Sequence, residues 1–136
     1  MSTLTRWIAA LLAPSILAAC YDSTGPYNPP PPPPTLEGAW TATAFTTTTA
    51  GGTIDRFAEG LRFTITVNPN GTTLGAITSP TGDLAFTGTW DTTQAVLRFH
   101  QETPIFLDQL PFEVFPNRLV GDAHIGVTDF HVVLRK

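Results

Sequence analysis

The strongest constraint on the fold is a two-residue alternation of apolar and polar side chains after residue 36. It is clearest in residues 61–67 and 84–90, and it continues in residues 97–100 and 130–132. Successive side chains of a strand point to opposite faces, so this period predicts strands with one buried and one solvated face. Many of the outward positions are threonines, which are β-branched and suit a pleated surface in contact with water.

Turn signals separate the alternating segments. Residues 68–71 and 79–82 share the pattern X-Pro-X-Gly, in which proline presets φ at the second turn position and glycine is favoured at the fourth. We therefore expect an all-β domain, a small antiparallel meander barrel of about eight strands, with a β-sandwich as the alternative. The expected strands are 38–47, 61–67, 72–78, 84–90, 95–101, 111–116, 118–125 and 129–135, and the wider gaps at 48–60 and 102–110 are expected to hold a loop or one helical turn.

The first twenty residues have the features of an export signal. Arg6 precedes an apolar run at residues 7–17, which is about half the length needed to cross a bilayer. The run ends in Leu17-Ala18-Ala19-Cys20, which resembles the lipobox of bacterial lipoproteins. This resemblance implies cleavage between Ala19 and Cys20 and a diacylglyceryl group on the Cys20 sulfur. An ordinary secretory signal with an incidental cysteine is the alternative.

Three segments follow from this reading: a signal peptide at 1–19, a proline-rich membrane tether at 20–35 and a β domain at 36–136. Six consecutive prolines, Pro29 to Pro34, exclude helix and central strand and favour an extended polyproline II spacer. Cys20 is the only cysteine, so the domain has no internal disulfide and depends on its own core. Without Arg6 the chain keeps six basic and eleven acidic side chains, a balance that opposes nucleic-acid binding.

The first expected strand opens with Gly38-Ala39-Trp40, a Gly-x-Trp that resembles the start of lipocalins and lipocalin-like bacterial domains. The resemblance implies an eight-stranded barrel in which Trp40 closes the floor and Arg135 packs across it. An eight-stranded barrel is just wide enough to be filled by side chains or to hold one small ligand. The residues expected to form a filled core or line a pocket are Trp40, Phe63, Phe86, Trp90, Phe99 and Phe130.

The domain offers little material for catalysis. Its one serine, Ser79, lies in a predicted turn, and its one lysine is Lys136. We therefore expect no enzymatic activity and no cofactor. A hairpin turning at residues 127–128 would place His124 opposite His131, with Asp122 diagonal to it, on the outer face. Two imidazoles and a carboxylate suit zinc or copper, but solvated surface histidines are far commoner, so no metal site is predicted.

The sequence thus predicts a non-enzymatic lipoprotein of the cell envelope. Its expected partners are the membrane, through the lipid, and a small apolar ligand in the barrel. The expected site is the outer membrane or the outer face of the plasma membrane. The alternative is an interaction or scaffold module with a filled core that binds another envelope protein.

Lipidation has a direct test. We expect the mature protein, isolated from its host's membranes, to begin at Cys20 and to carry the added mass of a diacylglyceryl group. Mass spectrometry of the intact protein checks this. An unmodified Cys20 would contradict the lipoprotein assignment.

Overall fold

The computed structural model describes residues 34–103 and 105–136. The signal peptide, Cys20 and nearly all of the proline-rich tether lie outside the described residues. Within the described part, no helix is long and apolar enough to span a membrane.

The domain is all-β, as predicted, with nine strands and one short 3₁₀ turn. The turn, η1, spans Phe106–Gln109, inside the gap where the sequence predicted a loop or a helical turn. The strands are β1 (Gly38–Thr49), β2 (Gly52–Asp55), β3 (Arg62–Val67), β4 (Thr72–Ser79), β5 (Gly82–Thr93), β6 (Val96–Gln101), β7 (Phe112–Phe115), β8 (Arg118–Ile125) and β9 (Thr128–Arg135).

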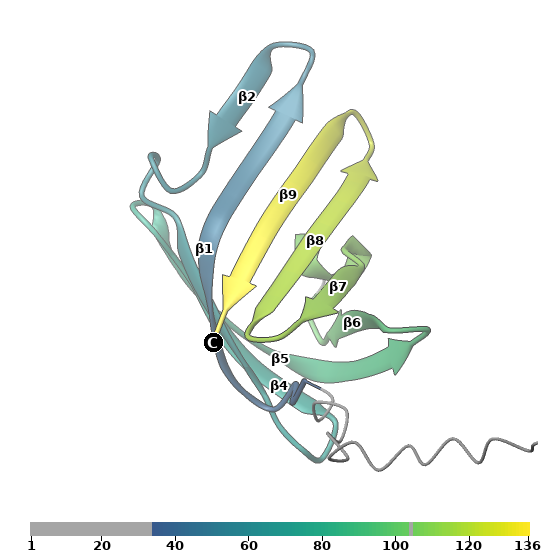
Figure 1. The fold of residues 1–136 in the computed structure, drawn as a ribbon. Helices are drawn as coiled ribbons and strands as arrows, with labels where there is room; N and C mark the ends of the chain where they lie inside the picture. Colours follow the sequence, from purple (N-terminus) through teal and green to yellow (C-terminus); the bar gives the residue numbers. More distant parts are fainter. Residues whose placement is uncertain (1–33, 104) are drawn as a thin grey trace, which may run out of the picture. The chain divides into compact units, whose positions relative to one another are not determined.

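Eight of these strands close into an antiparallel barrel. From β3 to β9 each strand pairs with the next along the chain, and β1 completes the ring by pairing with β3 on one edge and β9 on the other. Figure 1 shows β1, β9 and β8 running side by side at this closure. The predicted meander barrel is therefore confirmed.

Strand β2 is the addition that the sequence did not predict. It pairs only with the last four residues of β1, from Thr46↔Asp55 to Thr49↔Gly52, and lies outside the closed ring. All four β2 residues are exposed, so the segment has no alternation of buried and exposed positions that could have marked it as a strand.

Strand β5 is longer than predicted. The expected strands are 84–90 and 95–101, but pairing of β5 with β6 continues through Asp91↔Arg98 to Thr93↔Val96. The chain then reverses at Gln94 and Ala95, whose φ angles of 54° and 64° are both positive. Such angles belong to a tight two-residue hairpin turn, and neither residue type signals one in the sequence.

A bulge in β1 changes which residues of the strand face the interior, from the even-numbered ones before it to the odd-numbered ones after it. Trp40 and Ala42 are buried, the register against β9 then shifts between Ala42 and Ala44, and the next buried residues are Phe45 and Thr47. One extra residue on a bulged strand re-aims the side chains that follow it. The bulge is the reason Phe45 faces the interior, a position absent from the predicted core.

The barrel interior is packed with apolar side chains. Trp40, Phe63, Phe86 and Phe99 are 3% exposed or less. Trp90 and Phe130 are only partly buried and pack against the edge of the core. The other fully buried side chains of the core are Ile65, Val67, Leu97, Leu107, Leu110, Phe112, Leu119, Val132 and Leu134.

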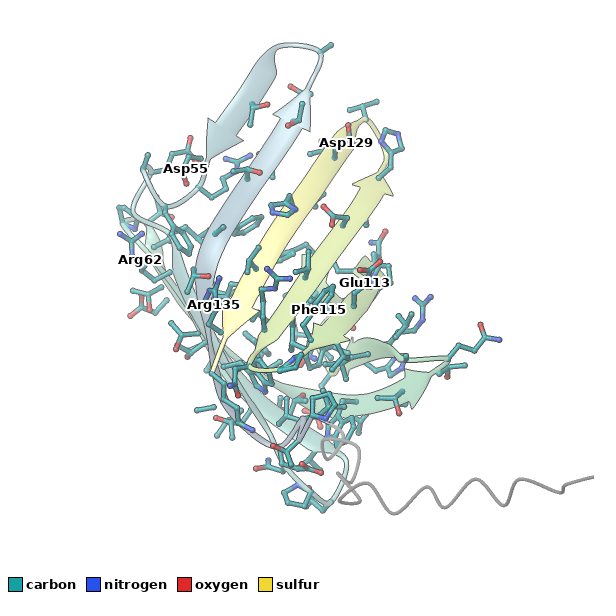
Figure 2. All side chains as sticks on the ribbon, in the orientation of Figure 1. Asp55, Arg62, Glu113, Phe115, Asp129 and Arg135 are labelled. Carbon is teal, nitrogen blue, oxygen red and sulfur yellow. The ribbon has the colours of Figure 1, made fainter. Side chains whose placement is uncertain are left out.

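Trp40 closes the end of the barrel where the described chain begins. Its indole Nε1 donates to the Leu36 carbonyl oxygen at 2.7 Å, and Lys136 Nζ lies 5.5 Å from its ring centroid. The expectation that Arg135 packs across the tryptophan is wrong: Arg135 is exposed and lies opposite Arg118 on β8. Lys136, the next residue, takes that place (Arg135 is labelled in Figure 2).

The packing of β4 against β5 has a stability test. A Cβ on Gly75 would overlap the Phe86 ring and lie 2.7 Å from the Thr64 carbonyl oxygen, which is backbone and does not yield. We expect Gly75→Ala to lower the free energy of unfolding by about 1–3 kcal/mol through overpacking. Chemical denaturation measures this. The control is Gly51→Ala, where the nearest atom is 3.6 Å away and the expected change is below about 0.5 kcal/mol. Equal losses in both variants would contradict the packing argument.

Candidate functional site

An apolar pocket opens at the end of the barrel opposite Trp40. It has a volume of about 380 Å³ and lies where β1, β4 and β9 approach the loop after β2. Its lining residues are Phe45, Thr47, Arg56, Glu59, Leu61, Ile77, Phe106, Thr128 and Phe130. Only Phe130 belongs to the set of lining residues expected from the sequence. We call this site the mouth pocket.

The base of the mouth pocket is a cluster of phenylalanine rings around Phe106. The Phe106 ring stacks on Phe45 with centroids 4.8 Å apart and on Phe130 with centroids 5.9 Å apart. Phe63 meets it edge-on at 5.9 Å. Rings at these separations attract one another beyond the effect of burial alone, so the cluster forms a firm apolar surface.

The 3₁₀ turn η1 places Phe106 in this cluster. Leu107 and Leu110 are 0% and 1% exposed, so burial of these two side chains in the barrel holds the turn in place. The Asp108 carboxylate holds it from the side, because Oδ1 accepts the Gln101 N–H at 2.6 Å and Oδ2 accepts the Ile105 N–H at 2.8 Å. Two charge-assisted bonds to backbone therefore fix the base of the pocket.

The rim of the mouth pocket carries one cation. Arg56 Nε donates to the Thr47 hydroxyl oxygen at 2.9 Å, and Arg56 Nη1 lies 2.8 Å from Glu59 Oε2. Thr47 is 2% exposed, so the guanidinium is anchored to a buried acceptor. The Arg56 N–H donates to the Phe45 carbonyl oxygen at 2.9 Å, which ties the loop to β1. Nothing in the sequence pattern distinguished Arg56, because its position depends on a loop folding back over β1.

The histidine arrangement differs from the one predicted. The β8–β9 hairpin turns at Gly126 and Val127, one residue earlier than expected, so His124 lies opposite Asp129 and His131 lies opposite Asp122. Each imidazole Nδ1 is 2.6 Å from its aspartate, on an exposed face, and Figure 2 labels Asp129 near the hairpin tip.

The two histidines are therefore divided between separate pairs and do not share one aspartate. Among the described residues, no group of three or more histidine, cysteine or acidic side chains is placed to hold a metal ion. The remaining histidine, His100, forms a third pair of the same kind, with Nε2 2.5 Å from Asp91 Oδ2.

No family model matches the chain, and no curated protein matches it. Among solved structures, that of a DUF4847 family protein from Bacteroides vulgatus is similar to it. The similarity covers 73% of this chain and 92% of that one, at 15% sequence identity and a TM-score of 0.48.

Removing the carboxylate that secures η1 tests how firmly the pocket base is held. We expect Asp108→Ala to lower the free energy of unfolding by about 1.5–3 kcal/mol, because two half-buried backbone N–H groups lose a charged acceptor. Denaturant titration measures the loss. Asp83→Ala, at an exposed carboxylate at the start of β5, is the matched control, with an expected change below about 0.5 kcal/mol. Equal stability of Asp108→Ala and wild type would contradict the role given to Asp108.

Proposed function

We propose that this protein is a lipid-anchored component of a bacterial cell envelope that binds a small apolar molecule in the mouth pocket without transforming it chemically. The observation that carries the proposal is the pocket itself, whose walls are largely phenylalanine, leucine and isoleucine. Pockets for small molecules are typically concave, mostly apolar and about 300–1,000 Å³ in volume, and 380 Å³ falls within this range.

The placement of the chain supports this proposal. The described chain enters the domain beside Trp40, whose indole bonds to Leu36, and the mouth pocket opens at the other end of the barrel. The point where the proposed tether reaches the domain, at Thr35 and Leu36, is therefore remote from the pocket.

Binding is proposed in preference to catalysis because of what lines the pocket. Its polar side chains are those of Thr47, Arg56, Glu59 and Thr128, and Arg56 bonds to both Thr47 and Glu59. The lining contains no cysteine, serine, histidine or lysine, and its one carboxylate, Glu59, is paired with Arg56.

A scaffold function is the second candidate, and two features favour it. Below the mouth pocket the barrel is filled by side chains. Within residues 34–103 and 105–136, β2 pairs with β1 alone, so its other edge can accept a strand from a partner. Crosslinking in intact cells separates the candidates, because one dominant protein adduct would favour the scaffold.

Titration with a simple apolar probe tests the binding proposal. The full chain carrying Cys20→Ser is suitable, since no attached acyl chain then competes for the pocket. We expect 1-octanol to shift the amide NMR signals of Phe45, Leu61 and Ile77 and to leave those around Trp40 unchanged.

A filling variant provides the control. Thr128→Trp places a large side chain in the pocket and is expected to weaken octanol binding by roughly tenfold. Thr64→Trp places the same side chain at an exposed position on β3 and should leave binding unchanged. If 1-octanol causes no saturable change in the amide NMR signals of the protein with the unsubstituted pocket, the binding proposal is wrong.

A further inference from the structure

We infer that the mouth pocket selects amphiphiles that carry a carboxylate, with Arg56 binding the headgroup and the phenylalanine cluster binding the apolar part. This inference rests on the proposed binding function and narrows it to one class of ligand. The juxtaposition behind it is a single guanidinium held at the edge of an apolar pocket.

The guanidinium is held in place before any ligand binds. Its Nε bond to the buried Thr47 hydroxyl fixes it over β1, and the backbone bond from Arg56 to Phe45 fixes the loop that carries it. The side chain is 33% exposed, so it is partly withdrawn from water. A cation positioned in this way loses little conformational freedom when an anion arrives.

Arg56 also keeps donors available for a ligand. Nε and Nη1 are bonded to Thr47 and Glu59, while Nη2 forms no hydrogen bond to any described residue. A guanidinium presents its N–H groups in a planar fork that matches the two oxygens of a carboxylate. Glu59, whose side chain is 51% exposed, is the anion that Arg56 Nη1 already binds.

The Glu59 carboxylate therefore shows which ligand group Arg56 can bind at the rim, namely a carboxylate. A ligand carboxylate would take the place of the Glu59 carboxylate on Arg56 while its apolar part covers Phe106 and Phe130. Because an exposed ion pair between residues three apart is weak, the exchange is feasible. A neutral ligand lacks the charge attraction to Arg56, and a cationic one is repelled by it.

The experiment compares probes of equal chain length on the full chain carrying Cys20→Ser. Octanoate, 1-octanol and octyltrimethylammonium are titrated by NMR, below concentrations at which they aggregate. We expect Arg56→Gln to weaken octanoate binding roughly tenfold more than it weakens octanol binding. Glu59→Gln removes the internal competitor and is expected to strengthen octanoate binding selectively. Arg98→Gln, at an exposed position on β6, is the matched control and should change neither.

The outcomes separate failure of the carboxylate inference from failure of the binding function. If octanol binds but Arg56→Gln affects both probes equally, the carboxylate inference fails and the binding function stands. If no probe binds, the proposed function fails and the inference fails with it. Should Arg56→Gln lose its dispersed NMR spectrum, Glu59→Gln decides alone: stronger octanoate binding with unchanged octanol binding supports the inference, and no selective gain overturns it. Tighter binding of octyltrimethylammonium than of octanoate also overturns it.

Discussion

The pairing of β1 with β9 is the constraint on which the rest of the structure depends. It turns a meander into a ring and leaves no open edge between the first and last strands of the barrel. β1 meets this demand by pairing with β3 at its start, with β9 along most of its length and with β2 at its end. The bulge near Thr43 lets the same strand point Trp40 into one end of the barrel and Phe45 into the other.

The mouth pocket is a consequence of this bulge and of η1. Phe45 faces inward only because the alternation of β1 changes parity, and Phe106 meets it only because Leu107, Leu110 and Asp108 hold the 3₁₀ turn inside the barrel. The rings then form a base above the packed core. The barrel axis below the mouth pocket is occupied by packed side chains.

Much of the fold was readable from the sequence because period-two alternation reports directly on strands that bury one face. Each of the eight barrel strands overlaps a predicted segment, and Trp40, Phe63, Phe86 and Phe99 lie in the interior. The alternation does not report on β2, because a fully exposed hairpin arm has no such pattern, or on Phe45, because a bulge interrupts it.

The site was less predictable because its residues come together only through tertiary structure. Arg56 lies in a loop of ordinary composition. The position of its guanidinium depends on the hydrogen bond to Thr47, nine residues earlier. Phe106 is one apolar residue in a gap without periodicity. In both cases the deciding contact joins a loop to a strand whose pairing must already be formed.

The β8–β9 hairpin has two possible registers that bury nearly the same side chains, and its outer face distinguishes them. A displacement of two residues keeps every side chain on its own face, so inward leucines and valines discriminate weakly against it. On the outer face the two registers pair different side chains. The observed register sets imidazole against carboxylate twice, whereas the displaced one would set imidazole against imidazole. The solvent-facing histidine–aspartate hydrogen bonds thus form only in one of the two alignments of the last two strands.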